Sequence, residues 1–166
     1  ERIGIDGILK HEVGENKKLT FELPIPTHKE AIELVLRILT NDETKVINSI
    51  KEIQAIGHRV VHGGEFFKES TIVTKDVIEK IEQLIPLAPL HNPANIMGIK
   101  ICQELMPNIP NVTVFDTAFH QTMTKENFLY AVPYADYTEH HLRKYGFHGT
   151  SHYYVSNETV KILNKK

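Results

Sequence analysis

The segment "NVTVFDTAFHQTM" (residues 111–123) decides the fold. The β-branched and aromatic side chains at its start favour a buried strand, and a carboxylate, Asp116, follows directly. The segment "EIQAIGHRVVHGGE" (52–65) has the same form, because an apolar run ends in two glycines and carries Arg59 and His62 to its end. Ligands of open α/β sheets bind at the carboxyl ends of strands, so both segments predict a site at one sheet edge.

The other strands follow from the spacing of apolar residues. Two β-prone runs, residues 8–13 and 19–23, flank "GENKK" (14–18), whose glycine and asparagine suit a turn, and they predict a β-hairpin. The chain then alternates between helical and strand periodicity. The predicted order is two strands, a helix, a strand, two helices, a strand and further helices. This order predicts an α/β domain with a mixed sheet flanked by helices.

Capping residues mark where the helices begin. Thr27 and Glu30 have the spacing of a capping box, Thr74 is a suitable N-cap, and Asn92 before Pro93 suits an N-cap with proline in the first turn. The predicted helices occupy residues 26–40, 74–85, 92–105 and 134–145, with a last helix from about residue 151.

The composition is that of a globular chain of 166 residues, of which 41% are hydrophobic. Basic and acidic residues number 19 and 21 without a run of five like charges, which argues against nucleic-acid and membrane partners. Cys102 stands alone, so it is expected in the core with Met97, and a cytoplasmic protein is favoured. No membrane-length apolar run or signal peptide is visible, and the start at Glu1 without methionine predicts a fragment.

Three polar stretches offer Arg59, Asp116 and His148 as candidate catalytic residues. Arginine supplies a planar fork for a carboxylate or phosphate, and histidine can donate to developing negative charge. The helix expected after Gly149 would point free N–H groups at an anion. Asp116 is costly beside an anion unless a metal ion or an arginine offsets its charge. The set therefore predicts an anionic substrate.

Four segments carry a resemblance to a known family. They are "GHRVVHGGE" (57–65), "LAPLHNPAN" (87–95), "VFDTAFHQTM" (114–123) and "YGFHGTSHYYV" (145–155). In the same order they resemble the signature segments of the acetate kinases, ATP-dependent acyl kinases of the actin/hexokinase/Hsp70 superfamily. The resemblance implies a ribonuclease-H-like α/β lobe (actin-like ATPase superfamily) in residues 1–118, without its first hairpin, and the start of a second, similar nucleotide-binding lobe in residues 119–166.

The resemblance also implies an activity and its reactants. It implies reversible, direct in-line phosphoryl transfer between ATP and acetate, giving acetyl phosphate and ADP, with Mg²⁺ or Mn²⁺ as the cofactor. The full-length protein would be a cytoplasmic homodimer. Propionate or butyrate is the alternative acceptor, because a methylene or two is worth only about 1–3 kcal/mol in an apolar pocket. The family's N-terminal phosphate loop and most of its second lobe are not within the 166 residues, so the chain alone is expected to be inactive.

Roles are likewise implied residue by residue. Arg59 would hold the acyl carboxylate and the phosphoryl group in flight, Asp116 would orient the acetate and the magnesium ion, and His148 would stabilise the transferring phosphoryl group. An acetate oxygen is already an anion at neutral pH, so the reaction needs charge neutralisation and alignment more than a base. No direct metal ligand is assigned in the chain. The other expected contacts are Val61, Leu90 and Phe147 around the methyl group, His91 at the substrate, and His148 with Gly149 at the nucleotide.

Some alternatives stay open. His62, His91 and His120 could be loop or capping residues or could touch the substrate. A serine esterase is a distant alternative, since "HGGE" resembles an oxyanion loop and "GTSHY" a nucleophile elbow with Tyr153 where glycine should be. The remaining histidines outside these motifs, His11, His28, His140 and His141, are expected to be solvated.

A histidine metal site is a further alternative. The pairs His58/His62 and His148/His152 both have i,i+4 spacing, which aligns two ligands on a helix. The first pair is predicted on a strand, where this spacing separates the side chains by roughly 13 Å. The spacing therefore argues against a site at His58 and His62.

Overall fold

The structure is a computed structural model that describes residues 1–14 and 17–165. Contacts divide the chain into two compact units. The first unit comprises Glu1–Ile56 and Met97–Asn111, and the second comprises Gly57–Ile96 and Val112–Lys166. The predicted division after residue 118 concerns the lobes of a larger fold and stays a prediction.

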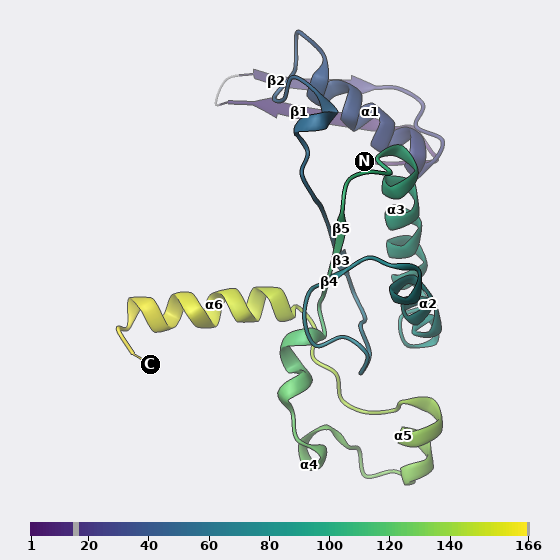
Figure 1. Cartoon of the computed structure of the whole chain (residues 1–166), viewed down its shortest axis with the longest axis vertical. Coiled ribbons are helices and arrows are strands. Elements are labelled where there is room, and N and C mark those ends of the chain that lie inside the picture. Colours follow the sequence, from purple (N-terminus) through teal and green to yellow (C-terminus); the bar gives the residue numbers. More distant parts are fainter. Residues whose placement is uncertain (15–16, 166) are drawn as a thin grey trace. The chain divides into compact units, whose positions relative to one another are not determined.

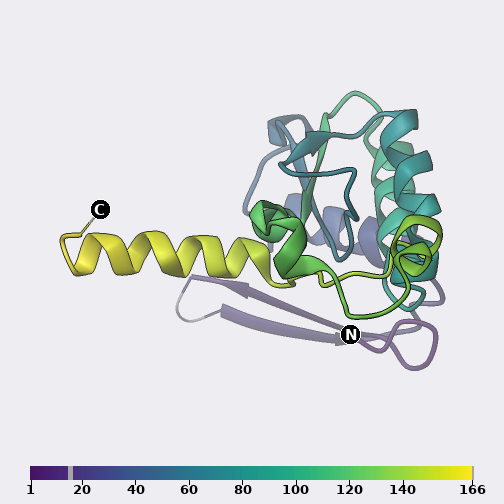
Figure 2. The same cartoon turned by 90° about the horizontal axis from the view of Figure 1, so that it is seen from below.

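The first unit contains the predicted β-hairpin. Strand β1 (Ile8–Val13) pairs antiparallel with β2 (Lys17–Glu22) along its whole length. β2 begins earlier than the predicted run 19–23, and the predicted turn includes residues 15 and 16, which lie outside the described residues. Helix α1 lies alongside the hairpin in both views (Figures 1 and 2).

Helix α1 (His28–Thr40) begins at the predicted cap. The Thr27 hydroxyl oxygen accepts a hydrogen bond from the Lys29 backbone N–H at 3.2 Å, which satisfies one N–H group of the first turn. The same hydroxyl donates to the Glu30 carboxylate. The Thr27 side chain and, to a smaller extent, its backbone N–H lower the pKa of Glu30, so the pair has the reciprocal contacts of a capping box.

The core of the first unit lies between α1 and the second half of α3. Its buried members are Leu36, Cys102 and Met106. Cys102 is free and buried, as predicted, and burial raises the pKa of its thiol. Met97 is 39% exposed, contrary to the prediction, because α3 (Asn92–Leu105) turns Ile99 inward instead.

A three-stranded sheet forms the centre of the second unit. Its order is β3 (Ile56–Val60), β5 (Asn111–Phe115) and β4 (Thr71–Ile72). β4 runs antiparallel to β5, whereas the hydrogen bonds between β3 and β5 follow the same order along both strands, as in a parallel pair. These bonds include Ile56 N to Pro110 O and Asp116 N to Val60 O. The sheet is therefore mixed, as predicted, and β4 is an edge strand that the pattern does not predict.

Helices cover one face of this sheet (Figure 2). Helix α2 (Lys75–Gln83) begins at the predicted cap Thr74, whose side chain accepts from Val77 N at 3.3 Å. A 3-10 turn, η2 (Ile85–Leu87), then leads to the start of α3. The buried apolar side chains of this unit are Val60, Phe67, Val77, Ile81, Leu84, Ala88, Ile96 and Phe115.

Asn92 does not act as the predicted N-cap, because α3 already includes it. Its side-chain oxygen accepts a hydrogen bond from His62 N at 3.2 Å, and its amide nitrogen donates to His62 O at 3.1 Å. The side chain is fully buried, so the two bonds satisfy polar atoms that water cannot reach. Asn92 therefore fixes the chain that follows β3.

The chain beyond Asp116 is mostly helical within the described part. Its elements are η3 (Ala118–Thr122), α4 (Lys125–Phe128), α5 (Tyr134–His140) and α6 (Gly149–Ile162). α6 begins at Gly149, two residues before the predicted start, and rests on η3 through the rings of Tyr153 and Phe119. Figure 1 shows the rest of α6 leaving the sheet of its unit. None of the described helices is long and apolar enough to cross a membrane.

Arg143 holds the loop between α5 and α6. Its side chain is 3% exposed, donates to Glu65 at 2.6 Å, and lies over the ring of Phe128 at 3.6 Å and that of Tyr145 at 5.0 Å. A buried guanidinium is tolerated only when it is paired, so the contact with Glu65 fixes this loop to the segment after β3. Tyr145 is thereby brought beside His62.

Candidate active site

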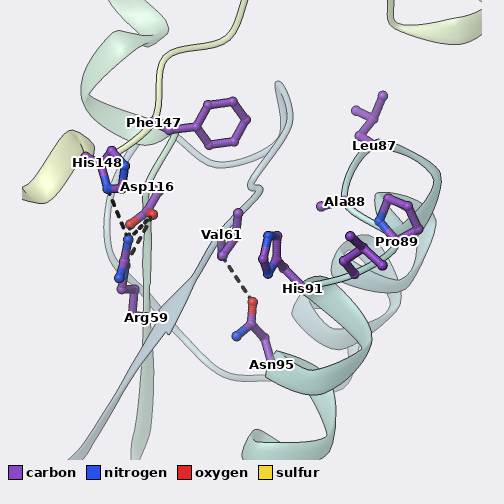
Figure 3. A pocket seen from close by; sticks show the side chains of 11 residues that line it. Arg59, Val61, Leu87, Ala88, Pro89, His91, Asn95, Asp116, Phe147 and His148 are labelled. Atoms are coloured by element: carbon purple, nitrogen blue, oxygen red, sulfur yellow. Dashed lines mark hydrogen bonds and ion pairs between the residues drawn. The ribbon is translucent and has the colours of Figure 1, made fainter.

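Arg59 and Asp116 form a bidentate ion pair at the ends of neighbouring strands (Figure 3). Arg59 Nε lies 2.9 Å from Asp116 Oδ1, and Nη2 lies 2.7 Å from Oδ2. The carboxylate is 3% exposed and the guanidinium side chain 63% exposed. The hydrogen bonds to Asp116 raise the pKa of Arg59. A nearly buried acid is thus compensated by an arginine that still reaches solvent.

The backbone around Asp116 explains its position. Its N–H donates to Val60 O at 3.0 Å, which continues the β3–β5 pairing one residue beyond β5. The next residue, Thr117, is fully buried, and its hydroxyl accepts from Gly63 N at 3.0 Å. The segments after the two strands are therefore joined directly, and this brings Arg59 to Asp116.

His148 completes the cluster from the loop before α6. Its Nδ1 lies 3.3 Å from Arg59 Nη2. An arginine can only donate, so Nδ1 accepts, and in the neutral ring the proton is on Nε2. The His148 backbone has φ 53°, a left-handed conformation that costs a non-glycine residue about 1–3 kcal/mol. That conformation turns the ring toward Arg59 at the start of α6.

Close contacts at two glycines hold the His148 loop against the rest of the unit. Gly149 N donates to Asp116 O at 2.8 Å, and a Cβ at this position would overlap the same oxygen. A Cβ on Gly146 would overlap the ring of His120. His120 Nε2 also donates to Phe147 O at 3.0 Å. The loop is thereby fixed on both sides of His148.

A pocket of about 620 Å³ opens beside the cluster (Figure 3). It has an apolar wall from residues 87–90 and a polar end at Arg59 and Asp116, so it can hold an anion with a small apolar group. Its lining residues are Arg59, Val61, Leu87, Ala88, Pro89, Leu90, His91, Asn95, Asp116, Phe147 and His148. Every residue predicted to contact the acyl substrate lines this pocket. Leu90 does so at the rim, since it is 86% exposed.

A second pocket of about 460 Å³ adjoins the same three polar residues. It continues along the first turns of α6, where three residues that carry a hydroxyl group line it. Its lining residues are Arg59, Asp116, His148, Thr150, Ser151 and Tyr154. The cluster therefore adjoins two spaces, one beside the wall of residues 87–90 and one along the start of α6, and could contact a reactant in each.

The other histidines with open roles do not line either pocket. His120 holds the carbonyl of Phe147, as described above. His62 is 2% exposed, and burial lowers its pKa to about 4. His11, expected to be solvated, donates through Nε2 to Thr44 O at 2.9 Å, because the hairpin brings it to that carbonyl.

Asn95 is a pocket residue that sequence reasoning missed. Its side-chain oxygen accepts from Val61 N at 3.1 Å, so it fixes the strand end that carries the pocket wall. Asn92 and Asn95 are three residues apart on α3, which places both on one helix face. That spacing was a usable signal, because two asparagines on one face at a strand end can satisfy its free backbone groups.

The alternative sites find little support. No strand leads into the loop before α6, so Ser151 does not sit at the strand–turn–helix elbow of a serine esterase. Within residues 1–14 and 17–165, no group of three or more His, Cys, Asp or Glu side chains is placed to hold a metal ion. Asp116 is the single carboxylate among the residues lining the two pockets, and Arg59 contacts both of its oxygens.

Comparisons with known proteins agree over the whole chain. A model of the acetokinase family matches residues 1–166. The acetate kinase of Thermotoga petrophila is 55% identical over 100% of this chain and 41% of its own length, and that of Agathobacter rectalis is 56% identical over 98% and 41%. This chain thus spans about two fifths of the length of these relatives.

Solved structures give the same result. The crystal structure of Porphyromonas gingivalis acetate kinase superimposes with a TM-score of 0.93 at 46% identity, covering 100% of this chain and 42% of that one. A propionate kinase from Francisella tularensis superimposes with a TM-score of 0.91 at 42% identity, with the same coverage. These likenesses confirm the predicted fold class, the α/β fold of the actin-like ATPases.

Proposed function

The chain belongs to the acetokinase family, and we propose that the full-length protein, meaning this chain with whatever sequence flanks it, transfers a phosphoryl group reversibly between ATP and acetate. The products would be acetyl phosphate and ADP. One observation carries the proposal: Arg59, Asp116 and His148 line both the pocket with the apolar wall and the adjoining pocket along α6. Such a cluster can hold an acyl acceptor on one side and a phosphoryl donor on the other.

Acetate fits the first pocket by charge and shape. Its methyl group would lie against Val61 and Phe147, and its carboxylate would face the Arg59 guanidinium. The acceptor oxygen attacks the γ-phosphorus while the bond to the β–γ bridging oxygen of ATP breaks, and ADP leaves with that electron pair. No proton has to be removed from a carboxylate at neutral pH, so alignment and charge neutralisation supply the rate enhancement.

The three polar residues would have different roles in the phosphoryl transfer. Arg59 presents a planar fork that neutralises charge on both reactants, and Asp116 holds that fork in one orientation. His148 accepts from Arg59 at Nδ1, which leaves its Nε2–H to donate to a phosphoryl oxygen. A preorganised donor of this kind stabilises charge that develops in the transition state.

The family implies Mg²⁺, or Mn²⁺, and the residues of this chain fit it only in part. Magnesium in kinases is held by one or two carboxylates together with substrate phosphates. Asp116 is a single carboxylate already bonded to Arg59, so it would act on the ion at most through water. When bound, the ion would arrive with ATP and neutralise its phosphate charge.

Propionate is the second candidate acceptor. The superposition on a propionate kinase at 42% identity favours it, and a pocket of about 620 Å³ exceeds what a methyl group fills. Butyrate is the next longer acid to test. We also propose, from the family, that the full-length protein is a cytoplasmic homodimer, and that residues 1–118 and 119–166 belong to its two lobes.

The proposal is tested by a trapping assay on the full-length protein. Acetate, MgATP and hydroxylamine should yield acetyl hydroxamate in amounts that depend on the enzyme and on both substrates. Propionate and butyrate should be run in parallel, and Arg37→Lys, an exposed arginine of α1, provides a neutral control. If none of the three acids forms a hydroxamate, the proposed function is wrong.

A further inference from the structure

The ring of Phe147 points into the first pocket (Figure 3). The ring of His62 packs against it. Phe147 is 41% exposed, whereas His62 is 2% exposed and does not line the pocket. The two rings meet edge to face, with centroids 5.6 Å apart and planes at 71°. Phe147 therefore has a substrate side and a side that rests on His62.

His62 is held from several directions. Asn92 bonds both its N–H and its carbonyl, at 3.2 and 3.1 Å. Its Nδ1 accepts from Gly64 N at 3.0 Å, and Tyr145 packs against its ring at 4.5 Å. The backbone of His62, its Nδ1 and one face of its ring all make contacts, so the ring cannot shift without breaking them.

The backbone of Phe147 is fixed as well, because its carbonyl accepts from His120. The remaining freedom of Phe147 is rotation of its side chain. Movement away from the pocket is blocked by the His62 ring, which occupies the space behind. The depth of the pocket at this wall is thus set by a residue that the substrate would never touch.

We propose that His62 is a positioning residue: it holds the Phe147 ring forward and thereby limits the length of the acyl chain that the pocket accepts. The proposal rests on the proposed acyl kinase function and names a determinant of its substrate class. It predicts that loss of the His62 ring lengthens the pocket. Longer acids should then gain relative to acetate, while the chemistry at Arg59 and His148 stays in place.

The decisive variant is His62→Asn in the full-length protein. The asparagine oxygen can still accept from Gly64 N, so the local turn is retained while the ring is lost. Values of kcat/KM are measured for acetate, propionate and butyrate. The propionate-to-acetate ratio should rise about threefold or more, a fraction of the roughly 10–200-fold that one methylene is worth in a fitted pocket.

A matched control separates positioning from general destabilisation. Ile81→Ala removes an equally buried side chain of α2 that lines neither pocket, so it should lower Tm and leave the acid ratio unchanged. If His62→Asn does not fold, Tyr145→Leu removes the support of the His62 ring instead and should shift the ratio in the same direction.

The outcomes are distinguishable. An active wild-type protein whose acid ratio stays the same in the variant, with only Tm lowered, makes His62 an ordinary core residue and overturns the inference alone. A wild-type protein that phosphorylates none of the three acids overturns the proposed function and the inference with it.

Discussion

The two sides of the first pocket are held in different ways. At the polar end, directional bonds fix the geometry: Arg59 is paired with Asp116 through both carboxylate oxygens, and Gly149 bonds the Asp116 carbonyl. The opposite wall is a turn, residues 87–91, that is held by short-range backbone hydrogen bonds such as His91 N to Ala88 O at 3.1 Å, and it exposes Leu90. The comparison teaches that the polar end depends on contacts between segments distant in the sequence, whereas the opposite wall depends on contacts within one segment.

The largest effect is expected when both sides are kept and the rest of the protein is removed. The 166-residue chain contains both ends of the pocket but spans about 41% of its relatives' length. Phosphoryl transfer needs nucleotide and acceptor aligned together, so the chain alone should fall more than about a hundredfold below the full-length protein in the hydroxylamine assay. Circular dichroism should confirm that the chain is folded. If the 166-residue chain turned over within about a hundredfold of the full-length protein, its residues alone would suffice for the reaction.

His148→Ala removes a donor from the polar end. If Nε2–H acts on the transition state, kcat should fall by about a hundredfold while KM for acetate changes little. Steady-state kinetics over a range of acetate concentrations separate the two parameters. His140→Ala, at the exposed end of α5, is the matched control. A change confined to KM would instead place His148 in substrate binding.

Arg59→Lys tests the fork at the same end. Lysine keeps the charge but cannot span both Asp116 oxygens, so turnover should fall about tenfold or more with the fold retained. Arg37→Lys should behave as wild type in the same assay. Near-normal turnover of Arg59→Lys would show that a positive charge at this position suffices and that the planar fork is not required.

The smallest effect is expected on the apolar wall. Leu90 is 86% exposed, so Leu90→Ala removes little buried surface and should raise KM for acetate by less than about threefold, with kcat unchanged. Val61→Ala, deeper in the pocket, should have the larger effect of the two. A tenfold rise for Leu90→Ala would mean that this residue closes over the substrate.

Local signals predicted the regular elements well. Thr27 and Thr74 cap the helices that their sequences indicate, and the apolar run before Asp116 is a strand. Arg59 and Asp116 were also predictable as neighbours, since both follow from strand ends at one edge of a sheet. His148 was a candidate because it lies in a polar stretch just before a predicted helix, and the family resemblance supplied its expected role.

The rest depends on partners distant in the sequence. Asn92 has the local pattern of a cap, yet its side chain bonds the backbone of His62, 30 residues earlier. Arg143 is enclosed by Glu65 and two aromatic rings, and the sequence around Arg143 does not indicate these contacts. Met97 is exposed because the orientation of α3 follows from its packing, which helical periodicity alone does not fix.

The contact between Gly149 and Asp116 has a consequence in genetic terms. Every missense change in the codon for Gly149 adds a Cβ atom, and that atom would overlap the carbonyl oxygen of Asp116. The neighbouring groups are backbone and the Cβ of Phe119, which cannot rotate aside as the tip of a flexible side chain could. Selection on activity should therefore leave only synonymous variation, at the third position of this codon.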